Sequence, residues 1–431
     1  MDLTQQPPRR PSNLSILSMA NLARMADKAR ATRDETHGEY LYGMESGLDE
    51  TLLLFLGISE EDFADASERY NDVELGQWVS RAASKTDAEI TAYNNDLLNR
   101  QPQSEGAKQR LKDRIAKYAP ERTDIKTVVQ SLELEDWGNF REVDLTKRPP
   151  KTPYNRTVAG LYAVARMADK ARAAKTDQLN GYIYNCPIDV ALLGFLGISS
   201  DAFQEAAWQN PNDIELGDWI RAHSQHTSAE IAQFNYIVSH KGPEDDRGKD
   251  IFKKTLDRVA PGRTDITKWF DLLDLDDECD YGLVDLTRHA PHSPYDQSAM
   301  GMFGLSRMID KGRAVLGKSL GNYFFGQDSG LDRAVLGFLG ISAEDFLTML
   351  KTHKTDESVV NWLKSQCDKT ETEIATYNTE ISTLAPVNER QKTWFQSYMQ
   401  RLAPDRTDIT CFLALVQLDD QVAFARCKAG V

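Results

Sequence analysis

Cysteine is scarce in this sequence: five occur among 431 residues, and no two of them form a CxxC pair. They are Cys186, Cys279, Cys367, Cys411 and Cys427. A sparse, odd-numbered set is untypical of a disulfide scaffold and fits a reducing compartment. We therefore expect a cytoplasmic protein.

Positive charge is also in the minority, and the net charge is -15. An acidic surface opposes the phosphate neutralisation that drives nucleic-acid binding, and anionic membranes repel it. No apolar run approaches the ~18–20 residues of a membrane span, and the first residues lack the apolar region of a secretion signal. We expect neither nucleic acid nor a membrane as partner, and the oligomeric state stays open.

Motifs for common cofactors are missing as well. Neither GxGxxG nor GxxxxGK[ST] occurs, so a conventional phosphate-binding loop is not supported. His223 with His226, and His289 with His292, have an i,i+3 spacing that suits a metal, but neither pair recurs elsewhere in the chain. The sequence predicts no metal and no other cofactor.

What the chain does contain is a threefold repeat. The heptapeptide "RMADKAR" begins at Arg24 and again at Arg166, and "RMIDKGR" begins at Arg307, so the copies are 142 and 141 residues apart. Other motifs recur at about the same spacing, among them "DLT", "FLGIS", a tryptophan and "RTDI". That period is the size of a domain. We predict three tandem domains: residues 1–142, 143–283 and 284–431.

Each repeat has the pattern of a mainly α domain with six or seven short helices. In "TVAGLYAVARMADKARAAK" the residues Leu161, Val164 and Ala168 belong to one apolar stripe at helical spacing. Serines at 59, 199 and 342 can each cap the helix that follows them, and a T-x-x-E capping box recurs at Thr86, Thr227 and Thr370. We also expect Asp189 to cap the helix that ends at Gly197, and the Thr or Asp of "RTDI" to cap the last helix.

The charged residues of the heptapeptide fall opposite the apolar stripe. An exposed i,i+3 or i,i+4 ion pair contributes only ~0.2–0.5 kcal/mol, which gives little reason to keep three near-identical sets. Two hypotheses remain. The charges form a buried ion network, with Asp169 paired to Arg166 or to Arg263 of "RTDI"; or they line a pocket in which Arg holds an anion while Asp and Lys transfer protons.

A second repeated stretch follows the heptapeptide. "GEYLYGMESGLD", "GYIYNCPID" and "GNYFFGQDSGLD" occupy equivalent places, so Tyr40 and Tyr42 match Tyr182 and Tyr184. Ser46, Cys186 and Ser329 each stand three residues before the Asp. A small nucleophile at a helix start can be catalytic, but no His recurs beside it to act as base, so a loop residue that caps the helix is the simpler interpretation.

These motifs together resemble the bacterial family of domain of unknown function 5069. The resemblance rests on "SPY", "RMxDKxR", "YxYNCPxD", "FLGI", "TxxEI", "APxRTDI" and "LDLDD", and it covers nearly the whole chain three times. The second repeat carries the motifs most fully. The first departs at Ser12 and at "ESGLD", and the third at Gly312 and at "DSGLD". The resemblance implies a single domain per repeat and supplies no reaction.

Two functions are compatible with the sequence. The first is an uncharacterised protein that binds or transforms a small polar or anionic metabolite; whether it is an enzyme stays open. Its catalytic residues would be Asp27, Lys28, Asp169, Lys170, Asp310 and Lys311. Its ligand-binding residues would be Arg24, Tyr40, Tyr42, Arg166, Tyr182, Tyr184, Cys186, Arg307 and Tyr323. The second is a non-catalytic tandem-domain scaffold, which repeated exposed apolar residues would favour.

Overall fold

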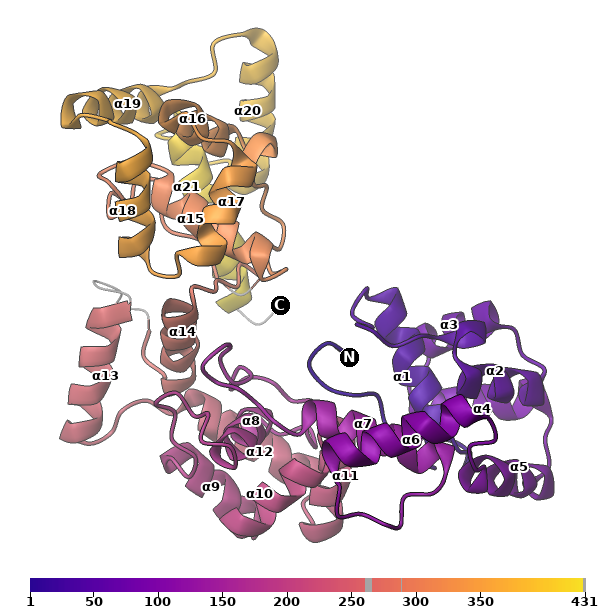
Figure 1. Cartoon of the computed structure of the whole chain (residues 1–431). Helices are drawn as coiled ribbons and strands as arrows, with labels where there is room; N and C mark the ends of the chain where they lie inside the picture. The colour runs from indigo at the N-terminus through magenta and orange to yellow at the C-terminus, as the bar shows by residue number, and fades with distance from the viewer. Residues whose placement is uncertain (260–265, 288, 429–431) are drawn as a thin grey trace. The chain divides into compact units, whose positions relative to one another are not determined.

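The computed structural model describes residues 1–259, 266–287 and 289–428, and these residues form 21 α-helices and two short 3-10 helices without any strand (Figure 1). Each sequence repeat contributes seven α-helices in the same order, which confirms the mainly α, threefold architecture. The regularity follows from the capping and periodic signals that each repeat carries separately.

The helices of the first repeat are α1 Leu22–Arg33, α2 Gly47–Leu56, α3 Glu60–Arg69, α4 Asp72–Ala83, α5 Asp87–Asn99, α6 Glu105–Tyr118 and α7 Val128–Phe140. Those of the second are α8 Val164–Ala174, α9 Pro187–Leu196, α10 Ser200–Gln209, α11 Asp213–His223, α12 Ser228–His240, α13 Asp246–Val259 and α14 Trp269–Tyr281. Those of the third are α15 Leu305–Leu316, α16 Gly330–Leu339, α17 Ala343–Thr352, α18 Asp356–Gln366, α19 Glu371–Thr383, α20 Glu389–Leu402 and α21 Phe412–Lys428. The 3-10 helices, η1 Gly43–Glu45 and η2 Gly326–Asp328, precede α2 and α16.

By packing, the chain divides into two compact units, Met1–Lys241 and Gly242–Val431. The first holds α1–α12, and the second begins with α13 and α14, which lie side by side (Figure 1). The limit between the units falls inside the second sequence repeat. The domain limits expected from the sequence therefore stay a prediction.

In the heptapeptide helices α1, α8 and α15 the heptapeptide itself is buried on all sides, apart from the partly exposed Arg30. Leu161, Val164 and Ala168 are buried as expected, although α8 begins only at Val164, so Leu161 precedes the helix. The charged residues opposite them are buried too: Arg166 is 5% and Lys170 4% exposed. The face opposite the apolar stripe is thus covered by other elements and is no solvated surface.

Most expected caps are confirmed. The hydroxyls of Ser59, Ser199 and Ser342 accept from backbone amides at the starts of α3, α10 and α17. Complete capping boxes begin α5, α12 and α19 at Thr86, Thr227 and Thr370. Gly197 ends α9 in the left-handed conformation, with φ 66°, which glycine adopts without strain.

Two expected caps are wrong. Asp189 is the third residue of α9, and Cys186 occupies the cap position; Asp189 turns toward a buried lysine instead. "RTDI" does not begin the last helix, because α7 starts later, at Val128 with Thr127 as its cap, and α21 starts at Phe412. In the second repeat "RTD" falls outside the described residues.

No helix in the described part of the chain combines the length and apolarity needed to cross a membrane.

Candidate functional site

The four charged side chains of each heptapeptide reach four different parts of their fold. We call them the charged hub. Its members are Arg24, Asp27, Lys28 and Arg30 in the first repeat, Arg166, Asp169, Lys170 and Arg172 in the second, and Arg307, Asp310, Lys311 and Arg313 in the third. Except for Arg30, which is partly exposed, all of them are buried. Buried charges are tolerated only when they are paired, so the partners decide what the hub can do.

The first arginine of the hub binds the last helix. Arg24 Nη1 lies 2.6 Å from Asp136 Oδ2 of α7, and the Tyr40 hydroxyl donates to Asp136 Oδ1 at 2.7 Å. The Arg24 guanidinium also lies 5.4 Å from the centre of the Tyr40 ring. Burial and the neighbouring carboxylate raise the pKa of Tyr40 above its usual range. The phenol therefore stays protonated and acts as a donor.

The third repeat has the same arrangement. Arg307 pairs with Asp420 of α21, Tyr323 donates to Asp420 Oδ1 at 2.8 Å, and the guanidinium lies 5.3 Å from the Tyr323 ring centre. In the second repeat Arg166 lies 5.4 Å from the Tyr182 ring centre and donates to the Lys151 carbonyl at 3.3 Å. The structure brings together these arginines and tyrosines, which the sequence analysis had named as ligand-binding residues, with Asp136 and Asp420, which it had not named.

The lysine of the hub binds the start of the second helix. Lys28 Nζ lies 2.6 Å from Asp49 Oδ2, and it donates at 2.9 Å to both the Leu41 carbonyl and the Ser46 hydroxyl. Loss of water on burial outweighs the attraction of Asp49 and lowers the pKa of Lys28 to about 8.

Lys170 repeats this arrangement with Asp189 at 2.7 Å, the Ile183 carbonyl at 3.1 Å and Cys186 Sγ at 3.3 Å. Lys311 does so with Asp332 at 2.6 Å, the Phe324 carbonyl at 3.0 Å and the Ser329 hydroxyl at 3.1 Å. Three equivalent ammonium groups therefore each hold one carboxylate, one loop carbonyl and one helix-cap side chain.

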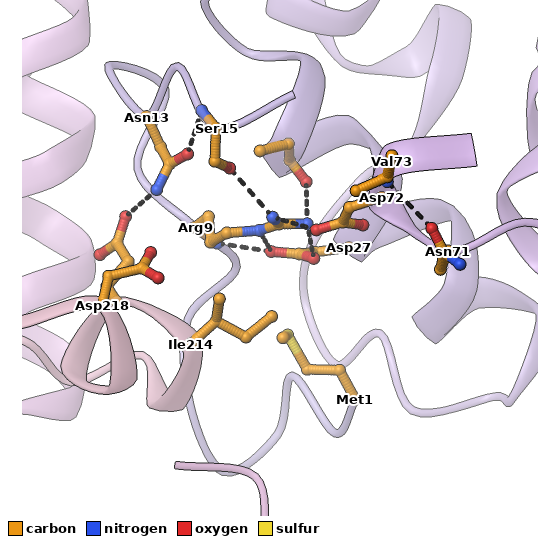
Figure 2. A network of polar contacts seen from close by, with 12 residues as sticks. Met1, Arg9, Asn13, Ser15, Asp27, Asn71, Asp72, Val73, Ile214 and Asp218 are labelled. Atoms are coloured by element: carbon orange, nitrogen blue, oxygen red, sulfur yellow. Dashed lines mark hydrogen bonds and ion pairs between the residues drawn. The ribbon is translucent and has the colours of Figure 1, made fainter. Parts of the chain in front are cut away.

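The aspartate of the hub binds the segment that precedes the heptapeptide helix. Asp27 accepts from the Arg9 backbone N and Nε, both at 2.9 Å, and from Nη2 at 2.8 Å. Arg9 also donates to Asp72 at 2.6 Å, and Figure 2 shows its guanidinium between the two carboxylates. In the third repeat His292 takes the same place and lies 2.6 Å from Asp310 through Nδ1.

Asp169 binds other groups than Arg166, one of the two partners expected for it. Its Oδ2 accepts from Arg148 Nη1 at 3.0 Å and from the Lys151 backbone N at 3.1 Å, and Arg172 Nη1 lies 3.6 Å from Oδ1. Arg166, the expected partner, leaves the helix toward Tyr182 instead, and Arg263 falls outside the described residues. Burial opposes ionisation, but the charges of Arg148, Lys151 and Arg172 keep the pKa of Asp169 below its usual value.

The last arginine of the hub binds the start of the fourth helix. Arg30 Nη1 lies 2.7 Å from Asp72, and Arg313 Nη1 lies 2.6 Å from Asp356. Arg172 donates from Nε and Nη2 to the carbonyls of Ala207 and Asn210, both at 2.9 Å. The hub thus joins the preceding segment, the second helix, the loop before the fourth helix and, in the first and third repeats, the last helix.

The second tyrosines of the "YxY" stretch bind backbone. Tyr42 donates to the Glu60 carbonyl at 2.9 Å and Tyr184 to the Ser200 carbonyl at 2.7 Å. The residues between the paired rings point the other way. Leu41, Ile183 and Phe324 are 57%, 66% and 68% exposed. Sequence reasoning missed this set, although the alternation of rings with one other apolar residue was visible in all three copies.

A wide hollow of about 990 Å³ lies beside the start of α4. It is lined by Met1, Arg30, Arg33, Asp34 and the run from Ser67 to Glu74. Of the hub, Arg30 lines it; none of the residues expected to be catalytic or ligand-binding does so in the described structure. The roles proposed for those residues stay predictions.

The paired histidines bind groups of the protein itself. His223 and His226 approach the carbonyls of Trp219 and Phe195, and His289 lies 3.1 Å from Glu278. Among the residues that the structure describes, no cluster of three or more His, Cys, Asp or Glu side chains could hold a metal ion.

The described residues thus form three equivalent repeats of helices without strands, and a buried charged hub links the elements of each repeat. This arrangement defines a tandem helical-domain protein. The model of the family named domain of unknown function (DUF5069) matches it three times, at residues 5–137, 147–279 and 288–422. The chain belongs to this family, as the motifs had indicated. Comparison with curated proteins finds no match.

Proposed function

We propose that this chain is a non-catalytic binding protein in which each repeat presents one exposed apolar residue to a partner protein. These residues, Leu41, Ile183 and Phe324, are called the apolar tips. The observation that carries the proposal is their threefold recurrence at one structural position. A single exposed apolar side chain is ordinary on a protein surface, but three in equivalent places call for a common cause.

The way each tip is held supports this proposal. The carbonyl of every tip accepts a hydrogen bond from the buried lysine of its hub, at 2.9, 3.1 and 3.0 Å. The flanking rings turn inward; in the first repeat, for example, the Tyr40 and Tyr42 hydroxyls bind Asp136 and the Glu60 carbonyl. An anchored backbone loses little conformational freedom on binding, which favours affinity.

Three tips on one chain suit binding through several weak contacts. Burying one such side chain contributes ~1.5–3 kcal/mol, too little for a stable complex by itself. Linked contacts raise the overall affinity without any new interaction type. The proposed partner therefore offers several apolar sites or is itself repeated.

The alternative, a pocket for a small polar or anionic metabolite, stays a prediction. Lys28, Lys170 and Lys311 are each bonded to a carboxylate and a carbonyl of their own fold. A ligand anion would have to displace those partners.

We also propose a cytoplasmic location, in which the thiols of Cys186, Cys279, Cys367 and Cys411, all free in the structure, would stay reduced.

The test uses a photo-crosslinking residue at 41, 183 or 324, one at a time, in the full chain within cells that naturally make it. The matched control carries the same residue at Asp201, an exposed polar position of α10. We expect the three tip positions to crosslink one common protein that the control position does not. We also expect a triple variant with serine at Leu41, Ile183 and Phe324 to lose at least tenfold in affinity for that protein.

Two results would overturn the proposal: crosslinking at the tips that matches the control, or unchanged affinity of the triple variant at unchanged melting temperature.

A further inference from the structure

The first and second repeats share an octapeptide that starts their fourth helices. "NDVELGQW" runs from Asn71 to Trp78, and "NDIELGDW" runs from Asn212 to Trp219. The third repeat has "TDESVVNW" at this place, from Thr355 to Trp362. The Asp is kept in all three repeats, whereas the Asn, the apolar residue and the Glu are kept in two repeats and lost in the third.

In the second repeat this octapeptide binds a segment of the first repeat. Asn212 Nδ2 donates to the Pro7 carbonyl at 2.8 Å, and the Asp213 backbone N donates to Gln6 Oε1 at 2.7 Å. Glu215 accepts from the Arg10 backbone N at 2.8 Å and lies 3.6 Å from the Arg10 guanidinium. We call Gln6–Asn13 the lead-in segment.

This contact buries the start of α11. Asn212 and Asp213 are almost fully buried, and Glu215 is 7% exposed. Asn13 Nδ2 adds a hydrogen bond to Glu215 at 3.3 Å. Loss of water raises the pKa of Glu215 despite the Arg10 charge, as befits a carboxylate enclosed by an interface.

The same residues of the first repeat face outward. Asn71, Val73 and Glu74 are exposed, with Val73 at 72%, and they line the 990 Å³ hollow described above. Glu74 here closes a capping box with Asn71, whereas in α11 the lead-in segment has taken Glu215. The first repeat therefore carries, in Asn71, Asp72 and Glu74, the same three polar residues with which the second repeat binds the lead-in segment.

We infer that the α4 start of the first repeat is a docking site for an extended, proline-containing segment of another protein. That segment presents a side-chain carbonyl and, four residues later, an arginine, as Gln6 and Arg10 do for α11. This site is separate from the apolar tips and does not depend on the function proposed for them.

A second copy of the chain is a poor occupant. Its lead-in segment is already held by Glu215, and the residues equivalent to Arg10 are Thr152 and Ser293, which lack the cation. The hollow itself does not repel an arginine strongly, because the carboxylates of Asp34, Glu68, Asp72 and Glu74 share its wall with three arginines. Two of these arginines, Arg30 and Arg33, are paired with Asp72 and Asp65. A different protein with the stated segment fits better.

The test measures binding of a fluorescent peptide with the sequence of residues 5–13, QQPPRRPSN, to the full chain by anisotropy. We expect saturable binding that Glu74→Gln weakens at least tenfold. Glutamine can still close the capping box, so melting should not change. A peptide with alanine in place of Arg10 should lose a similar factor.

The matched control is Glu215→Gln. If the peptide binds by displacing the chain's own lead-in segment, this variant will lose binding while Glu74→Gln keeps it, and the inference is wrong. Absence of saturable binding up to millimolar peptide would also overturn it.

Discussion

The contact between Lys170 and Asp189 offers the sharpest test of the charged hub as a structural network. The two side chains are 4% and 1% exposed, and Nζ lies 2.7 and 2.9 Å from the two carboxylate oxygens. Lys170→Met keeps the length of the side chain but leaves the Asp189 charge buried without its cation. Breaking a buried pair in this way costs about 3–5 kcal/mol.

That loss is large enough to read directly from a melting curve. For a folding unit of 241 residues, each kcal/mol shifts Tm by about 2–4 °C, so we expect a fall of about 6–20 °C. Calorimetry of the full chain should show this fall in the transition of the first compact unit, with the second unit as internal reference.

Lys147→Met is the matched control, because Lys147 is 81% exposed and binds only a neighbouring aspartate at its own surface. Such exposed pairs contribute little to stability because water and salt screen them, so the Tm of this variant should scarcely change. If Lys170→Met melts like Lys147→Met, the network interpretation is refuted. Loss of a ligand or of turnover at unchanged Tm would then favour the pocket.

Three further predictions concern single positions. Asp310 raises the pKa of His292 from 6.5 to about 9, so the stabilisation from their pair is complete below about pH 6.5 and should fade as pH rises through 9; His292→Gln should flatten this slope in melting curves. Asn185 has φ 68°, so Asn185→Val should destabilise by about 1–3 kcal/mol in urea unfolding, and Asn185→Gly by much less. Trp137→Ala removes a hydrogen bond to the Trp208 carbonyl and should cost at least about 0.5–1.5 kcal/mol, seen as a lower Tm of the first unit. A melting temperature of the parent chain that does not depend on pH would contradict the first prediction, and equal effects of the two Asn185 variants would contradict the second. An unchanged Tm of Trp137→Ala would contradict the third.

The sequence by itself determined the threefold repeat, the helical class and most helix starts. These features are local or periodic: a hydroxyl at 59 or 86 caps the helix that follows it, and apolar residues three or four apart define a buried face. The caps expected within "RTDI" failed because α7 and α21 start several residues later. The cap expected at Asp189 failed because a carboxylate near a helix start can bind either the backbone or a distant cation, and Asp189 binds the buried Lys170.

Only the tertiary structure decided where each charge of the heptapeptide goes. The partner of Arg24 is Asp136, 112 residues away, and Asp27 binds Arg9 of the preceding segment. A helical pattern shows that such charges lie opposite an apolar stripe, but not whether water or another helix covers them. The same applies to Leu41. Its exposure depends on the inward-facing rings of Tyr40 and Tyr42 and on Lys28, which binds its backbone carbonyl. Ion pairs and surface exposure depend on elements far apart in the chain, so no local pattern encodes them.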